Sequence, residues 1–119
     1  MSTESLIHND WRVPTIQELL TLVDYTREHP ASKIIDNLGF ENFWTCTKHA
    51  NANYDCYWYI GFGHGASGTC VSRYKFYVRC VRTSSEGTLQ WTKASDRPMT
   101  HSEALKYAKK LKSEAVYEV

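Results

Sequence analysis

Cysteine and histidine are the residues of this chain whose chemistry could support metal binding or catalysis. The sequence has four cysteines and five histidines, and Cys46 and His49 are separated by two residues, a spacing found in zinc sites. A structural zinc ion needs four ligands, and no second Cys-x-x-Cys or His-x-x-His completes the set. The signatures of nucleophile-elbow hydrolases, zinc proteases, P-loop enzymes and dinucleotide-binding enzymes are also missing. We therefore expect no metal, no cofactor and no enzymatic activity, and keep a Cys/His enzyme only as the last alternative.

Two polar stretches are the best candidates for a recognition surface. The first is KHANANYD at residues 48–55, and the second is the glycine-rich GHGASG at residues 63–68. Loops on a rigid scaffold often bear binding residues, and tyrosine offers a large, rigid face with a hydroxyl group. The side chains expected to bind a partner are His49, Asn51, Asn53, Tyr54, Asp55 and His64.

A hairpin is expected to hold both stretches in place. Residues 57–62 are bulky on both faces, as in a buried central strand, and residues 63–68 supply the turn. Residues 76–82 are expected to return as the second strand, with Arg79 and Arg82 on opposite faces. At least one of these arginines should lie over an aromatic ring or pair with a carboxylate. We expect both arginines, Cys80 and the four tryptophans to be structural.

Helical periodicity predicts one helix near each end of the chain. Thr15 and Glu18 form a capping box before apolar residues at positions 16, 19, 20 and 23, and this helix ends at Pro30 at the latest. Further strands are expected at 43–47, 89–91 and 116–119.

The second helix begins at another capping box, Thr100-x-x-Glu103. Its apolar stripe is expected to consist of Ala104, Leu105, Ala108 and Leu111, and its lysines are expected to be solvated. We expect it to pack beside the first helix and close the same core, so that Leu105→Asp would unfold the domain.

Length and composition indicate one α+β domain over residues 1–119. The 14 Lys+Arg and 13 Asp+Glu give a net charge of +1, which disfavours non-specific binding to nucleic acid. No apolar run reaches bilayer length and no signal peptide is evident, so a cytoplasmic protein with four reduced thiols is expected. Cys56 and Cys70 flank the expected turn, and whether they can pair stays open.

The sequence resembles the DUF1566 family, which is also called the Lcl C-terminal domain after a collagen-like adhesin. DWRVPTIQEL at residues 10–19 and VDY at 23–25 are similar to its DWRLPTxxEL…VDY signature. FWTCT at 43–47, WYIGFGHG at 58–65 and YVRCVR at 77–82 are similar to its later motifs and follow in the same order. The resemblance implies a C-type-lectin-like α+β fold with two helices, a small antiparallel sheet and a long loop region that bears the ligand surface.

Two features depart from the family pattern. Segments similar to TLQW at 88–91 and MTHSEALKYAKKL at 99–111 usually precede the DWRLP motif, whereas here they follow YVRCVR, which is the order of a circular permutation. The second departure is Ala108, where the family has a cysteine. If that cysteine pairs with the one in YVRCVR, Cys80 has lost its partner here, which agrees with an intracellular protein.

The expected function is a non-catalytic binding module. We expect a small cytoplasmic protein of a phage or another mobile element, which docks on a host or defence-system protein as an inhibitor. The alternative is an extracellular glycan-binding domain of the adhesin type. The calcium-binding motifs of sugar-binding C-type lectins are missing. A protein is therefore the first partner expected and a glycan the second, with neither membrane nor nucleic acid involved.

Overall fold

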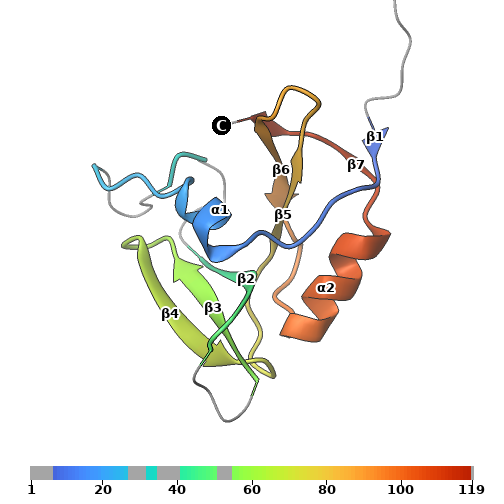
Figure 1. Cartoon of the computed structure of the whole chain (residues 1–119). Coiled ribbons are helices and arrows are strands. Elements are labelled where there is room, and N and C mark those ends of the chain that lie inside the picture. The colour runs from blue at the N-terminus through green and yellow to red at the C-terminus, as the bar shows by residue number, and fades with distance from the viewer. Residues whose placement is uncertain (1–6, 27–31, 35–40, 51–54, 119) are drawn as a thin grey trace, which may run out of the picture.

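The computed structural model describes residues 7–26, 32–34, 41–50 and 55–118, and within these ranges the chain forms an α+β fold (Figure 1). The class expected from the sequence is therefore confirmed. The helices are α1 (Ile16–Leu20) and α2 (His101–Lys110). The strands are β1 (Ile7–His8), β2 (Asn42–Lys48), β3 (Cys56–Gly61), β4 (Ala66–Val71), β5 (Arg79–Thr83), β6 (Leu89–Ala94), β7 (Ser113–Glu114) and β8 (Tyr117–Glu118).

The strands form three small antiparallel sheets. In the first sheet β3 lies between β2 and β4, in the second β6 lies between β5 and β8, and β1 pairs with β7 in the third. Residues 76–82 connect these parts. The Trp44 N–H donates to the Tyr77 carbonyl at 2.9 Å, and Arg12 and Val81 exchange backbone hydrogen bonds of 3.0 and 2.9 Å. The segment that enters β5 therefore holds the first sheet on one side and the N-terminal segment on the other.

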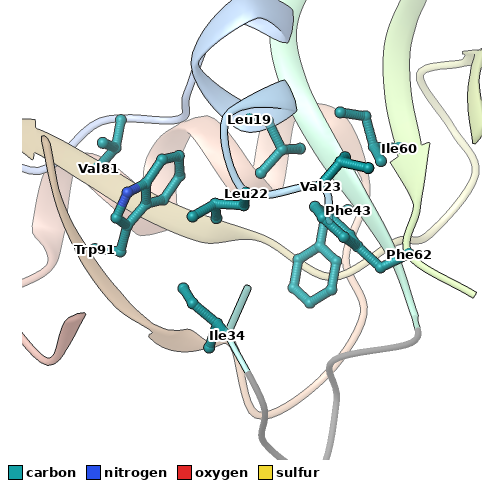
Figure 2. Packing of buried hydrophobic residues seen from close by; sticks show 9 residues of the cluster. All are labelled: Leu19, Leu22, Val23, Ile34, Phe43, Ile60, Phe62, Val81 and Trp91. Carbon is teal, nitrogen blue, oxygen red and sulfur yellow. The ribbon is translucent and has the colours of Figure 1, made fainter. Parts of the chain in front are cut away.

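The buried side chains form two clusters, and the alternation of residues 76–81 separates them. Tyr77 and Val81 pack in the first cluster, whereas Phe76, Val78 and Cys80 pack in the second. Figure 2 shows the first cluster, in which α1 and the turn after it lie over the inner faces of both larger sheets. Its buried members are Leu19, Leu22, Val23, Ile34, Phe43, Ile60, Phe62, Val81 and Trp91.

The second cluster brings α2 against the other side of the sheets. Its buried members are Trp11, Val13, Trp44, Val78, Cys80, Met99, Ala104 and Ala108. The expectation that the two helices close one core is therefore wrong, because Leu19 of α1 and Ala104 of α2 belong to different clusters. Leu105 is 39 % exposed and is not part of the buried stripe. The predicted unfolding by Leu105→Asp consequently loses its basis.

Both capping boxes are confirmed. The Thr15 and Thr100 hydroxyls accept hydrogen bonds from the N–H groups of Glu18 and Glu103, and each glutamate binds back to the N-cap backbone.

The helix α1 is shorter than its apolar pattern predicts. The pattern extends to position 23, whereas the helix ends at Leu20. The Leu22 carbonyl accepts the N–H of Lys33 at 2.8 Å, so the chain leaves the helix to pair with residues 32–33. Leu22 and Val23 are nevertheless buried.

The expected central hairpin is wrong in its second strand. β3 turns at residues 62–65 and pairs with β4 over six consecutive positions, from Gly61–Ala66 to Cys56–Val71. Of the expected second strand, residues 79–82 belong to β5 of the second sheet instead, and Phe76 and Tyr77 make isolated bridges to Met99 and Phe43. The expected turn at 63–68 included the first half of β4, because alanine, serine and glycine have low strand propensity. Cys56 lies opposite Val71, so Cys56 and Cys70 are not direct cross-strand partners.

The expected structural role of both arginines is confirmed. Arg79 is 3 % exposed and lies 5.1 Å from the Phe43 ring and 5.7 Å from the Tyr117 ring. Arg82 pairs with the Asp10 carboxylate at 2.7 Å. Trp11, Trp44 and Trp91 are buried as expected, whereas Trp58 is half-buried. β8 confirms the strand expected near the C-terminus.

Candidate functional site

The residues expected to bind a partner do not form one site. His49 and Asp55 lie where β2 ends and β3 begins, whereas His64 lies in the turn between β3 and β4. In the register of the sheet, Lys48 opposes Tyr57 and Asn42 opposes Gly61, so these positions are at opposite ends of β3. The two stretches are close in the sequence, but one precedes β3 and the other follows it. They therefore lie at opposite ends of this strand. The predicted residues Asn51, Asn53 and Tyr54 lie outside the described residues.

At the first end, which we call the loop end, short contacts fix the chain on both sides of residues 51–54. The His49 N–H donates to the Cys56 carbonyl at 2.9 Å, and the His49 ring lies 5.8 Å from a Trp58 ring, measured between centroids. Lys48 Nζ lies 3.3 Å from Asp55 Oδ1, with both side chains more than half exposed. Because both side chains are exposed, their charges are accessible for recognition. The ion pair itself contributes little stability.

The structure adds two residues to the loop end that the sequence analysis did not select. The Ser72 N–H donates to the Asp55 carbonyl at 2.8 Å, which brings the turn after β4 beside the start of β3. In that turn Tyr74 is 52 % exposed, and the Arg73 guanidinium lies 5.8 Å from its ring centroid. The signal was the sequence SRYK at 72–75, a basic stretch with one tyrosine. This stretch lies between the expected turn at 63–68 and the expected strand at 76–82, so the sequence did not indicate that it forms an exposed turn.

We refer to Lys48, His49, Asp55, Arg73 and Tyr74 as the loop-end surface. His101 lies beneath it and is 2 % exposed. Its ring stacks on Tyr57 at 3.5 Å, and its Nε2 lies 2.7 Å from the Thr45 carbonyl oxygen. Burial lowers the pKa of His101, although this hydrogen bond and the charge of Asp55 oppose the shift. The stack connects the start of α2 to β2 and β3, and it gives the loop-end surface a rigid base.

The opposite end of the first sheet, the turn end, contains a hollow of 260 Å³ next to His64. Small residues create it, because Gly61, Gly63 and Ala66 line it together with Asn42 and Tyr59. A Cβ atom at Gly61 would lie 2.6 Å from Asn42 Oδ1, so a larger residue there would displace this amide from its present position. The residues that line the hollow therefore include Tyr59 and His64, which have rings, and Asn42, which has an amide.

Three of the thiols, those of Cys46, Cys70 and Cys80, have raised pKa values, which is the opposite of what a catalytic nucleophile needs. All four cysteines are among the described residues, and none is in a disulfide. Burial raises the pKa of Cys46 and Cys70, and it raises the pKa of Cys80 to about 12. A nucleophilic thiol needs a lowered pKa. Among residues 7–26, 32–34, 41–50 and 55–118, no three His, Cys, Asp or Glu side chains are grouped as metal ligands.

Comparison with known proteins places the chain in a family of small domains. The family described as the Lcl C-terminal domain matches residues 2–82, and the chain belongs to this family. The match ends at Arg82, within β5, so β6, α2, β7 and β8 lie beyond it. No curated protein and no solved structure matches the chain. In the described part of the chain, neither helix has the length and apolar character needed to cross a bilayer.

Proposed function

We propose that this chain is a non-catalytic binding module whose partner is another protein. In this proposal it is a small protein of a phage or another mobile element, which acts in the host cytoplasm by docking on a host or defence-system protein. Its scaffold would be C-type-lectin-like, and the two helices with small antiparallel sheets support this. The four free thiols support a reducing compartment.

The observation that supports protein binding most directly is the exposed Tyr74 next to Arg73. Tyrosine and arginine are enriched among the residues that dominate protein–protein affinity. Tyr74 keeps half of its surface in solvent although its backbone is fixed by a hydrogen bond from its N–H to the Val71 carbonyl at 3.1 Å. A rigid, exposed ring loses little conformational entropy on binding. Lys48, His49 and Asp55 add polar groups of both charge signs at the same end of the sheet, which the hydrogen bond from Ser72 N–H to the Asp55 carbonyl brings beside the turn of Tyr74.

A catalytic role for a thiol receives no such support. The three cysteines with shifted pKa values are all shifted toward the protonated form, with burial as the main cause. His101 is engaged with the Thr45 carbonyl and the Tyr57 ring. These contacts hold the protein together and leave the exposed surface for recognition.

Photo-crosslinking tests the proposal. A photoreactive phenylalanine analogue replaces Tyr74, and in a matched control it replaces Tyr25, a second exposed tyrosine that follows α1 and is 74 % exposed. In a bacterial lysate we expect a crosslinked protein from position 74 and none from position 25. Changing Arg73→Ala in the first variant should weaken this product without changing the melting temperature. Equal crosslinking from both positions, or none from position 74, would contradict the proposal.

A glycan is the second candidate ligand, and the turn-end hollow is the observation that favours it. The Tyr59 ring and the Asn42 amide are the kinds of group that orient a small polar ligand in a pocket. A glycan array probed with the wild type, Tyr59→Ala and Tyr74→Ala separates the two candidates. Glycan binding that requires Tyr59 and not Tyr74 would favour the glycan-binding function over the protein-binding one.

A further inference from the structure

The outer edge of β4 is open, and we propose that the partner protein adds an extended segment to it as a fourth strand of the first sheet. This inference rests on the proposed function, because it names the mode in which a protein partner binds. Figure 1 shows β4 on the outside of the sheet, next to β3 alone. Strand addition at an exposed edge is an established mode of peptide recognition, in which backbone hydrogen bonds supply affinity.

The edge of β4 is regular over its whole length. All six residues pair with β3 without a register shift, so alternate N–H and C=O groups point away from the sheet. In the described part of the chain, no strand pairs with this side of β4. The segment ASGTCV contains no charge and no proline. Charges, prolines and bulges are the usual devices that protect an edge from pairing, and β4 has none of them.

The other edge strands of the two larger sheets are either bonded to another segment or very short. The side of β2 that faces away from β3 is bonded to Tyr77. The Trp44 N–H donates to the Tyr77 carbonyl at 2.9 Å, and the Tyr77 N–H donates to the Asn42 carbonyl at 3.0 Å. The side of β5 that faces away from β6 is bonded to Arg12, whose backbone nitrogen donates to the Val81 carbonyl oxygen at 3.0 Å. β8 is only two residues long. β4 is therefore the long open edge among the described residues.

An aromatic ring from the neighbouring strand keeps this edge in shape. A Cβ atom added to Gly68 would lie 3.1–3.2 Å from atoms of the Tyr59 ring, so this ring covers the glycine. The Tyr59 ring is itself held by Phe76 at a centroid distance of 4.7 Å. A ring that covers a strand glycine is a known way to stabilise a strand. The small residues Ala66 and Gly68 also leave space in which side chains of an added strand can contact Tyr59.

The charges around β4 indicate a segment of a different protein rather than a second copy of this chain. Arg73 is exposed two residues beyond β4, and residues 62–75 contain no aspartate or glutamate. A second copy paired edge to edge would bring no carboxylate from this region to Arg73. The expected occupant is a segment that is uncharged beside β4 and has an acidic residue at the end next to Arg73. Such a segment would run from the turn end to the loop-end surface, and it would connect the two halves of the site that the sequence predicted as one.

A phage-displayed library of random peptides is the probe, and the best peptide selected on the wild type is synthesised. We expect it to slow amide exchange in β4 at least about tenfold and to leave β2 amides unchanged. The blocking variants are Thr69→Pro and Cys70→Pro. Adjacent N–H groups point to opposite edges, so one of these prolines removes an outward N–H and keeps the pairing with β3. That folded variant should bind the peptide at least about tenfold more weakly.

Two matched controls accompany these variants. Ser85→Pro places a proline in the turn between β5 and β6, where Gly87 N–H donates to the Ser84 carbonyl, and it should bind like the wild type. Arg73→Gln should weaken binding at low salt and lose its effect at high salt. If neither β4 proline variant folds, amide exchange alone decides.

Unchanged exchange in β4, equal binding by a folded β4 proline variant, or no selected peptide would overturn strand addition. A dimer in sedimentation that protects β4 amides would overturn the choice of partner. These failures are distinct from failure of the proposed function. If Tyr74 crosslinks a protein equally well in the wild type and in the folded proline variant, strand addition fails and protein binding stands.

Discussion

His101 is a single residue whose surroundings set a pH dependence for the whole protein. A carbonyl oxygen only accepts hydrogen bonds, so Nε2 of His101 donates to the Thr45 carbonyl and the neutral ring needs no second proton. Burial is the main cause that lowers its pKa below the ordinary value of 6.5. The unfolded chain therefore binds a proton at a higher pH than the folded protein does.

The free energy of unfolding should fall as the pH drops below about 6.5, because the unfolded state then gains a proton that the folded state does not take up. The decrease continues until the pH reaches the lowered pKa of the folded state. Denaturant titrations at about pH 7.5 and about pH 5.5 measure it. His101→Gln should lose most of this dependence, and the control His49→Gln should keep it. The pKa values of Asp10, Glu18 and Glu103 are lowered from ordinary values of 3.8, 4.5 and 4.5, so the protonation of these carboxyl groups affects stability only at a pH below this window.

Single-residue roles were predictable from the sequence where the residue lies in a patterned strand. Arg79 and Arg82 alternate on β5, so opposite environments followed from the period of two. Arg73 and Tyr74 were not predictable in the same way, because their exposure depends on the turn after β4, and β4 itself was not expected as a separate strand. The contact between His101 and Thr45 joins residues 56 positions apart, and no local pattern encodes it.

At the scale of elements, α2 shows how tertiary packing selects one face of a helix. The periodicity gave an apolar stripe that included Leu105, whereas His101, Ala104 and Ala108 are the residues that face the core. Positions 101, 104 and 108 share one side of a helix, and position 105 lies at its margin. Small residues on this side let the helix lie close to Met99 and Cys80 in the second cluster.

Two substitutions on α2 should therefore change the free energy of unfolding in a way that hydrophobicity alone does not predict. The loss of an apolar side chain should have little effect, and the gain of one should be destabilising. Leu105→Asp should change the free energy of unfolding by only about 0.5 kcal/mol, because the side chain is on the surface. Ala104→Leu should lower it by about 1–3 kcal/mol, because the site is fully buried and has no room for a larger side chain. Urea denaturation of both variants measures the difference. A strongly destabilised Leu105→Asp would show that the exposed position is packed in solution.

Element types were largely predictable, but their pairing was not. Capping boxes located both helix starts, and aromatic or branched residues located β2, β3 and β6. β4 was missed because its sequence is typical of a turn, and it forms a strand only because β3 offers a partner and Tyr59 covers Gly68. The α+β class followed from composition and helix patterns, whereas the division into three sheets depended on long-range pairing.

At the scale of the whole molecule, the part beyond the family match completes both clusters. Residues 83–119 supply Trp91 to the first cluster, and Met99, Ala104 and Ala108 to the second. They also supply β6, which is the partner of β5. The matched range 2–82 thus lacks core residues on both sides of the segment 76–81.

A fragment that ends at Arg82 should fail to fold cooperatively, because it exposes both clusters and leaves β5 without its partner strand. Thermal unfolding followed by circular dichroism, with the full chain as the control, measures this. A sharp transition for residues 1–82 would show that the matched range folds alone. Adding the separate fragment 83–119 should restore cooperative unfolding if the two parts reassemble.

The shared position of residues 76–81 between the two clusters has a consequence for changes in chain length. One residue inserted before Val78 would reverse the side of the residues that follow it in this extended segment. Val78 and Cys80 would then face the first cluster, and the charged group of Arg79 would face the second. By contrast, an insertion in the exposed turn at 84–88 would alter only the length of a loop. Two adjacent parts of the chain should thus differ sharply in their tolerance of a single codon gained or lost.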